Sequence, residues 1–387
     1  MKRKTLFLSL FLCLIFSVSA QKKQTGRYEL VKNMPLYYET LREEMTFPDA
    51  WGHSSVKSFK KWRKQARNIL TECLQRAPQP AADFDYKVVA VEQREGYRAE
   101  KIEFNISAYT RIPAYLLVPD GDGPFPALVV LHDHGAHFSI GKEKNVRPFG
   151  VSDEVMQDAR QWADNCYEGV FVGDYFASQG YVVLAIDAFF WGERGRQDGV
   201  KYEAQEAVSA NFLQFGMSWC GYITYDDVAS VDFLASLPFV DEKSVGAVGF
   251  SMGAHRAWML SAMTDKVYAT AAICWMNTSE YLLTVTNNQS KGQSAYSMIV
   301  PGVRNHLDYP HVASIICPKP FLMFNGEYDK LFPVEGSRDA FGILENTWAS
   351  QKVSDRLVTK LWPTPHTFNR AMQAEVLQFF DKHLKQQ

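Results

Sequence analysis

Residues 249–253 read Gly-Phe-Ser-Met-Gly, a serine with a glycine two positions away on each side. An apolar, strand-like run ends just before the serine and a helix-like segment follows it, so a strand must reverse into a helix at Ser251. This reversal strains the backbone of the serine, leaves room only for glycine beside it and exposes the hydroxyl above the sheet edge. The pattern predicts a nucleophile elbow centred on Ser251.

A serine hydroxyl is a weak nucleophile at neutral pH and needs a histidine base that an acid orients. His366 follows the last predicted strand on a proline-bounded loop, and Asp329 lies on a turn after the strand before it. The resulting chain order of serine, acid and histidine predicts a triad of Ser251, Asp329 and His366. Glu327 and Glu280 are alternatives for the acid. The alternative interpretation of His366 is a histidine on a surface loop, without a role in the triad.

The tetrahedral intermediate of acyl transfer needs two N–H donors for its oxyanion. The backbone amide of Met252, next to the serine, is predicted to be one. The second is expected from residues 132–137, His-Asp-His-Gly-Ala-His, at His134 or Gly135. Because three of these side chains are imidazoles and one is a carboxylate, a metal site is the alternative. No second ligand cluster accompanies the loop, so we expect neither a metal nor another cofactor.

Three side chains after other strands are predicted to shape the substrate site. Trp191 and Arg194 follow a strand that ends at residue 186. Arg194 could pair with a substrate carboxylate or, alternatively, hold its own loop through an acidic neighbour such as Asp187. Trp275 ends a further strand, and it is interpreted as a platform for stacking a sugar, with a core position as the alternative.

The elements that must position these residues follow from the apolar pattern. Helix-like segments alternate with apolar runs at 127–131, 181–186, 245–250, 270–275, 320–324 and 356–361. Runs of period two from residues 86, 97 and 112 precede them and are typical of antiparallel strands. The alternation predicts an α/β fold with a mostly parallel central sheet and helices on both faces. The carboxyl ends of parallel strands meet at one edge, where the candidate residues would gather.

The N-terminal segment is predicted to direct export. Residues 1–20 contain basic residues, an apolar run and a small-residue cleavage site at Ala20, as in a secretory signal peptide. No later apolar run is long enough to span a membrane, so we expect a periplasmic or extracellular protein. Residues 21–84 are interpreted as a helical extension and 85–387 as the catalytic domain, with 278–317 as a possible lid.

Composition narrows the possible partners. The formal net charge is −2 and becomes about −5 when the three basic residues of the signal peptide are removed. A mildly acidic surface argues against nucleic acid or an anionic membrane as partner. Five cysteines remain after residue 20, and an odd number cannot form a complete disulfide framework.

With these residues in place, the chain resembles the α/β-hydrolases of the dienelactone-hydrolase-like group, close to the acetyl-xylan-esterase-like branch of bacterial carbohydrate esterases. The resemblance spans nearly all of the mature chain. Its most specific segments are Leu-Ala-Ser-Leu-Pro-Phe-Val-Asp at 234–241, Gly-Phe-Ser-Met-Gly at 249–253, Gly-Glu-Tyr-Asp at 326–329 and Pro-His at 365–366. It implies the α/β-hydrolase fold, ester hydrolysis without a cofactor and the triad named above.

The chain departs from these relatives at three places. Ser251 stands where dienelactone hydrolases carry cysteine. Acetyl-xylan and cephalosporin deacetylases usually have Arg-Gly-Gln and Ser-Gln-Gly, whereas this chain has Arg-Gly-Arg at 194–196 and Ser-Met-Gly at 251–253. Asp133 occupies a position that is often glycine in related hydrolases. The first two departures concern which ester the enzyme accepts. The third concerns which backbone amide is the second oxyanion donor.

The sequence therefore predicts an exported serine esterase that removes acetyl or methyl ester groups from a plant polysaccharide such as xylan or pectin. One alternative is a peptidase of the prolyl-oligopeptidase type, although residues 21–85 are too few for the propeller that usually precedes its catalytic domain. Another is a noncatalytic glycan-binding relative, against which the intact set of serine, acid and histidine argues.

Overall fold

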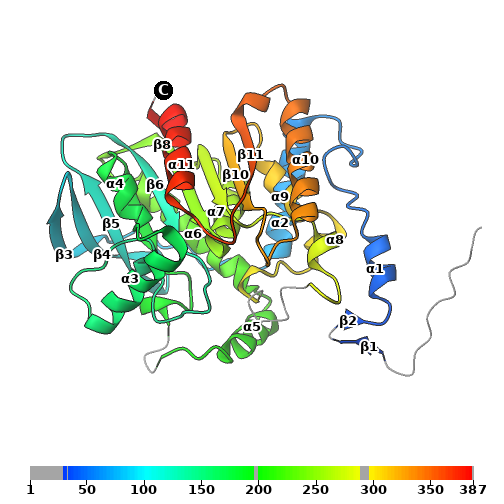
Figure 1. Ribbon diagram of the computed structural model, residues 1–387, viewed down its shortest axis with the longest axis horizontal. Helices are drawn as coiled ribbons and strands as arrows, with labels where there is room; N and C mark the ends of the chain where they lie inside the picture. The colour runs from blue at the N-terminus through cyan, green and yellow to red at the C-terminus, as the bar shows by residue number, and fades with distance from the viewer. Residues whose placement is uncertain (1–28, 33, 196–198, 288–295, 386–387) are drawn as a thin grey trace, which may run out of the picture.

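A nine-stranded sheet forms the centre of the computed structural model, which describes residues 29–32, 34–195, 199–287 and 296–385 (Figure 1). The predicted signal peptide lies outside these residues. In spatial order the strands are β11 (Leu357–Trp362), β10 (Phe321–Gly326), β9 (Ala269–Ile273), β8 (Val240–Phe250), β6 (Phe125–Leu131), β7 (Val182–Ile186), β5 (Thr110–Pro119), β4 (Tyr97–Ser107) and β3 (Lys87–Arg94).

The six strands from β11 to β7 are mutually parallel. β5, β4 and β3 complete one edge in antiparallel pairing. This arrangement confirms the predicted mostly parallel sheet with antiparallel strands at its start. The strands also occur close to their expected positions, although β8 begins earlier, at Val240.

Helices cover both faces of the sheet, which explains why its central strands are apolar without alternation. Leu128 and Val130 of β6 pack on one face, with the helices α3 (Asp153–Tyr167), α4 (Val172–Ser178) and α11 (Arg370–Phe380). Val129 and Leu131 pack on the other, with α6 (Trp219–Ala235) and α7 (Met252–Met263). On that second side, α10 (Val334–Ser350) packs beside β10.

Four helices of the described residues are absent from the sequence-based prediction: α3, α5 (Ala204–Gln214), α8 (Ser279–Leu282) and α9 (Tyr309–Ala313). α5 carries little apolar periodicity that would distinguish it from a loop, whereas α3 is amphipathic, with Ala159, Ala163 and Tyr167 buried at helical spacing, and the prediction misses its pattern. α3 matters for the site, because it places Trp162 and Tyr167 beneath the loop that follows β6.

The N-terminal extension is helical in two separate pieces. A hairpin of β1 (Leu30–Val31) and β2 (Met34–Pro35) leads into α1 (Tyr38–Glu44), and α2 (Phe59–Leu74) follows an irregular stretch. The extension that the sequence predicts to be helical is therefore irregular at 45–58. Residues 29–85 contain no propeller. No helix in the described ranges combines the length and apolar character needed to cross a membrane.

α2 docks on the outside of α6 and α7 through an apolar stripe and two arginines. Trp62, Ala66, Leu70 and Leu74 recur at helical spacing and are buried. Arg63 and Arg67 donate hydrogen bonds to the same carboxylate oxygen of Asp265, at 2.5 and 2.9 Å. Asp265 lies just after α7, so this ion-pair cluster ties the extension to the helix that begins at Ser251.

Replacing Asp265 by Asn should weaken this docking. Hydrogen bonds from Arg67 and Arg63 lower the pKa of the Asp265 carboxyl, so its contribution is complete at neutral pH and is lost only as the pH falls below the ordinary carboxyl range, about 4. Because Asp265 is exposed, we expect the free energy of unfolding at pH 7 to fall by only about 1 kcal/mol.

Chemical denaturation of Asp265→Asn beside Asp232→Asn measures this effect. Asp232 forms an exposed ion pair with one lysine, Lys266, at 2.6 Å, and it serves as the matched control. Equal losses of stability in the two variants would contradict a specific docking role for Asp265.

Candidate active site

Ser251 occupies a strained turn between β8 and α7. Its φ of 56° and ψ of −124° are values that residues other than glycine rarely adopt. The flanking glycines are required by close backbone approach: a Cβ on Gly249 would lie 2.1 Å from the carbonyl oxygen of Gly253, and one on Gly253 would lie 1.9 Å from that of Leu131. The structure therefore contains the elbow that the sequence pattern predicts.

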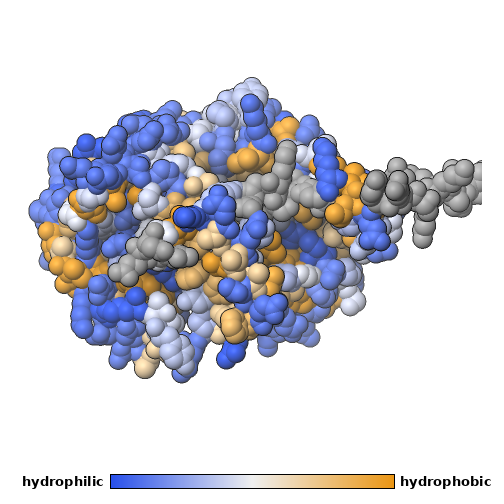
Figure 2. Space-filling model, turned by 90° about the horizontal axis from the view of Figure 1, so that it is seen from below, coloured by the Kyte–Doolittle hydropathy of each residue, from blue (hydrophilic) through white to orange (hydrophobic). Residues whose placement is uncertain are grey.

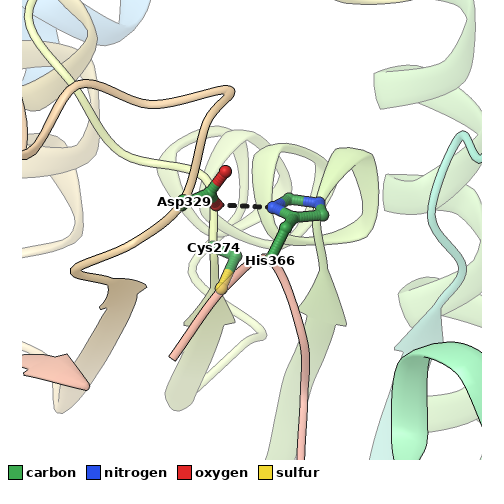
Figure 3. A group of neighbouring side chains, drawn as sticks. All are labelled: Cys274, Asp329 and His366. Carbon is green, nitrogen blue, oxygen red and sulfur yellow. Dashed lines mark hydrogen bonds and ion pairs between the residues drawn. The ribbon is translucent and has the colours of Figure 1, made fainter. Parts of the chain in front are cut away.

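His366 and Asp329 form a short hydrogen bond, with 2.6 Å between Nδ1 and Oδ2 (Figure 3). The Asp329 side chain is fully buried, whereas that of His366 is 23 % exposed. The other carboxylate oxygen accepts a hydrogen bond from the amide of Leu331 at 2.9 Å. The aspartate is thus fixed on both oxygens, and the second ring nitrogen of His366 points away from it.

The backbone brings the turn of Asp329 against the loop of His366. The amides of Glu327 and Tyr328 donate hydrogen bonds to the carbonyls of Trp362 and Thr364, at 2.7 and 3.1 Å. A Cβ on Gly326 would lie 2.6 Å from the Thr364 oxygen, so only glycine permits this approach. β10 and β11 are neighbours in the sheet, and their carboxyl ends therefore deliver acid and base together.

The two rival acids point elsewhere. Glu327 makes an ion pair with Arg338 at 3.2 Å, and Glu280 lies 3.9 Å from Arg42. Both carboxylates are substantially exposed. The geometry therefore favours Asp329 as the partner of His366.

Ser251 and His366 line one cavity of about 670 Å³. Hydrophobic residues gather near the middle of the face seen in Figure 2. The cavity wall is mostly apolar, with a few polar groups, as ligand sites usually are. Its lining residues are Asp133, His134, Gly135, Ala136, Trp162, Cys166, Phe250, Ser251, Trp275, Thr286, Asn287, Met298, Lys330, Leu331, Phe332 and His366.

Part of the predicted lid contributes to this wall. Thr286, Asn287 and Met298 come from the segment 278–317, which also contains α8 (Ser279–Leu282) and α9 (Tyr309–Ala313). Residues 288–295 of that segment lie outside the described part of the chain. A role in opening and closing the cavity stays a prediction.

Cys274 lies beneath the histidine and the aspartate in Figure 3. Its sulfur and the nearest ligand-type atoms of Asp329 and His366 all lie within 4.8 Å of one another. Burial, with the Asp329 charge adding to it, raises the pKa of the Cys274 thiol, so the thiol stays protonated at neutral pH. The short bond between the other two residues and the neutral sulfur favour an aspartate–histidine pair over a metal site.

The loop after β6 places His134 and Gly135 in the wall of the same cavity as Ser251. The His134 ring accepts a hydrogen bond from the Ala136 amide on Nδ1 (2.9 Å) and donates from Nε2 to Gln205 (3.0 Å). Burial lowers the pKa of His134 to about 4, so the ring is neutral near pH 7. The imidazole is fully occupied, and the backbone amides of the loop are what it can offer to a substrate.

The metal interpretation of this loop fits the geometry poorly. His132 uses both ring nitrogens, donating to the Asp133 carbonyl and accepting from the Ala188 amide, each at 2.8 Å. His134 is likewise occupied, and His137 contacts Asp158 at 2.9 Å. The imidazoles therefore hold protein groups and do not converge on one point.

The three predicted substrate contacts have different surroundings. Arg194 is buried in an ion pair with Asp226 at 2.7 Å and donates to the Asp187 carbonyl, which favours the loop-holding alternative. Trp191 is fully buried and donates from Nε1 to the His134 carbonyl at 3.0 Å. Trp275 lines the cavity, although packing covers nearly all of its surface.

Several residues around the site carry no recognisable pattern in the sequence. Lys142, Glu143 and Lys144 read as a solvated charge run, yet all three are buried between the loops that follow β6 and β7. Trp162 and Tyr167 both donate hydrogen bonds to Asp133. The one available clue was Asp133 itself, a carboxylate beside the expected oxyanion site that must have partners if it is buried.

Comparisons with known proteins agree with this fold. The model of the Abhydrolase family matches residues 14–347. A protein of Bacillus subtilis (strain 168), YtaP, whose name classes it provisionally as a hydrolase, is 26% identical over 323 residues, which are 83% of this chain and 98% of YtaP.

Two solved structures show the same fold. One, provisionally named an acetyl xylan esterase, comes from Bacteroides fragilis NCTC 9343; it has a TM-score of 0.68 at 20% identity and covers 87% of this chain and 83% of its own. The other is a glucuronoyl esterase from Solibacter usitatus, with a TM-score of 0.62 at 13% identity and coverage of 85% and 95%.

Replacing Gly253 by Ala should damage the elbow more than the rest of the fold. The new methyl group meets the Leu131 carbonyl, so α7 must move away from β6, at a cost of about 1–3 kcal/mol. Gly342→Ala is the control: it lies in α10 with open space around it and should stabilise the protein by about 0.5–1 kcal/mol. Thermal unfolding of both variants measures the difference, and equal shifts would contradict the close approach at residue 253.

Proposed function

The chain belongs to the Abhydrolase family, and on that premise we propose that it is an exported serine carboxylic-ester hydrolase acting on plant polysaccharide. The observation that carries the proposal is the buried Asp329–His366 pair, which borders the same cavity as the strained Ser251. A serine, a base and an orienting acid at one cavity are the requirements of acyl transfer through a covalent intermediate.

In the proposed reaction His366 accepts the hydroxyl proton of Ser251 as the serine oxygen attacks the ester carbonyl. The amide of Met252 donates to the oxyanion; it lies in the first turn of α7, where backbone N–H groups have no partner within the helix. An amide of the loop at His134 or Gly135 supplies the second donor. His366 then protonates the departing alcohol, and water activated by the same ring releases the acid from Ser251.

Asp329 contributes by holding the Nδ1 proton of His366, which keeps the other ring nitrogen available to the serine. The carboxylate also stabilises the imidazolium that forms during each proton transfer. The protonated Cys274 adjoins this pair without adding a competing negative charge.

The cavity fits a small ester group on a sugar. Its aromatic and aliphatic wall offers apolar surface for an acetyl or methyl group and for a sugar face. The likeness to an acetyl xylan esterase fold and a glucuronoyl esterase fold supports a carbohydrate ester. Acetyl removal is the first candidate, because Arg194 is committed to Asp226 and is not available for a uronate.

Methyl removal from a uronate ester is a second candidate. Lys330 is exposed and contributes to the cavity wall, so its ammonium group could attract the carboxylate product.

The proposal that the protein is exported rests on residues 1–20 alone, with cleavage near Ala20.

The triad is tested with p-nitrophenyl acetate. Ser251→Ala, His366→Ala and Asp329→Asn should each lower kcat by about 1,000-fold or more, because the three residues act as a unit. Glu327→Gln is the control for the rival acid; its carboxylate pairs with Arg338, and its kcat should stay within about threefold of the wild type. Wild-type rates in Ser251→Ala would overturn the proposed function.

The ester is identified by product release. We expect acetate from acetylated xylan, with methanol from methyl-esterified pectin as the result of the second candidate. Ser251→Ala serves as the blank for both substrates. If Lys330 attracts the carboxylate product, Lys330→Met should raise the inhibition constant of the released uronate and leave KM for p-nitrophenyl acetate unchanged. Release of neither product by an active wild type would exclude these two glycan esters.

A further inference from the structure

The second oxyanion donor depends on how the peptide groups of residues 133–135 are turned. Their two carbonyl oxygens each accept two hydrogen bonds from buried side chains. The Asp133 oxygen accepts from His132 Nδ1 at 2.8 Å and from Lys144 Nζ at 3.1 Å. The His134 oxygen accepts from Lys144 Nζ at 3.0 Å and from Trp191 Nε1 at 3.0 Å. Lys144 is the one side chain that holds both.

A trans peptide group is planar, and its N–H points opposite to its C=O. Holding the Asp133 carbonyl toward Lys144 therefore turns the amide of His134 away from the lysine. Holding the His134 carbonyl does the same for the amide of Gly135. Residues 134 and 135 border the cavity, whereas Lys144 is completely buried behind them. The lysine thus orients both candidate donors away from its own side of the loop.

Lys144 also faces the charge of Asp133. The Asp133 carboxylate borders the cavity, where a free negative charge would oppose a developing oxyanion. Its Oδ2 accepts hydrogen bonds from Trp162 (3.0 Å) and Tyr167 (2.8 Å), and its Oδ1 lies 3.6 Å from Lys144 Nζ. The ammonium group therefore offsets the charge of Asp133.

We propose that Lys144 is a positioning residue for ester hydrolysis: it holds the carbonyls of Asp133 and His134 so that the amides of His134 and Gly135 are set for the oxyanion. This inference rests on the proposed function. It assigns Lys144 no contact with substrate, and it moves Trp191 from the substrate site to the support of the same loop.

The burial of Lys144 argues that this arrangement is needed. A completely buried ammonium group loses its hydration, and burial lowers the pKa of Lys144 accordingly. An apolar side chain of similar length would fill the same space without that penalty. What it could not do is donate to two carbonyls at once.

The test compares Lys144→Met with Lys319→Met. Lys319 makes the same kinds of contact far from the site: it donates to the carbonyls of Thr264 and Val267 and lies 3.6 Å from Asp265. We expect Lys144→Met to lower kcat for p-nitrophenyl acetate by about 100-fold, the usual cost of a lost oxyanion donor, with KM within about threefold. Lys319→Met should lose stability and keep kcat.

Active-site titration of each preparation gives kcat per competent serine, so that partial misfolding does not count as lost catalysis. A second pair of variants covers the case in which Lys144→Met does not fold. Trp191→Phe removes one donor from the His134 carbonyl and should lower kcat by about tenfold. Its control is Trp348→Phe, whose buried Nε1 donates to the carbonyl of Lys319.

The proposal is overturned if Lys144→Met keeps wild-type kcat, or if the loss per titrated site is equal in Lys144→Met and Lys319→Met. When only the two tryptophan variants can be measured, equal kcat in Trp191→Phe and Trp348→Phe overturns the proposal. A wild type that hydrolyses no ester would instead overturn the proposed function.

Discussion

The contact between the first turn of α7 and the end of β6 is the constraint on which the site depends. Gly253 approaches the carbonyl of Leu131 so closely that no side chain fits between them. This contact fixes two things together: the strained serine at the start of α7, and the origin of the loop that begins at His132. Ser251 and residues 133–136 line the same cavity because neighbouring parallel strands end at the same height.

Buried charges then hold the loops that leave these strands. Lys142 binds Asp187 and Glu143 and so joins the loop after β6 to the loop after β7. Asp226 and Asp227 of α6 pair with Arg194 and Arg256, which tie the β7 loop and α7 to the same helix. Loops carry their own backbone polar groups, and charged side chains with several donors or acceptors can satisfy many of them at once.

Such pairs are expensive to desolvate and give no assurance of extra stability. Their value here is geometric, because all of them except Lys142–Glu143 join two segments that are distant in sequence. Arg194 and Asp226 are 32 residues apart, and Lys142 and Asp187 are 45. A site assembled from loops needs cross-links of this kind, since the parallel strands position only the first residue of each loop.

Prediction from sequence succeeds for features that follow from the periodicity of apolar residues or from glycines that a close backbone approach requires. The strands, the elbow at Ser251 and the placement of Asp329 and His366 after neighbouring strands all follow from such patterns. It misses Lys144 and leaves Arg194 open between a substrate contact and a loop-holding pair, because the pattern around a charged side chain near a strand end does not show whether that side chain is buried. Whether it is buried depends on α3 and α6, which pack over it from elsewhere in the chain.

The cavity wall has parts that differ in how firmly the surrounding structure holds their backbone. The wall formed by residues 133–136 is held by buried side chains on its far side, so its backbone is set before any substrate arrives. Another part of the wall comes from the 278–317 segment and from the turn at Lys330, which contribute side chains from irregular backbone. Loops of that kind vary without disturbing the sheet beneath them. Under the proposed function, the choice among esters would belong to this second part of the wall, and the chemistry shared by all esters would belong to residues 133–136.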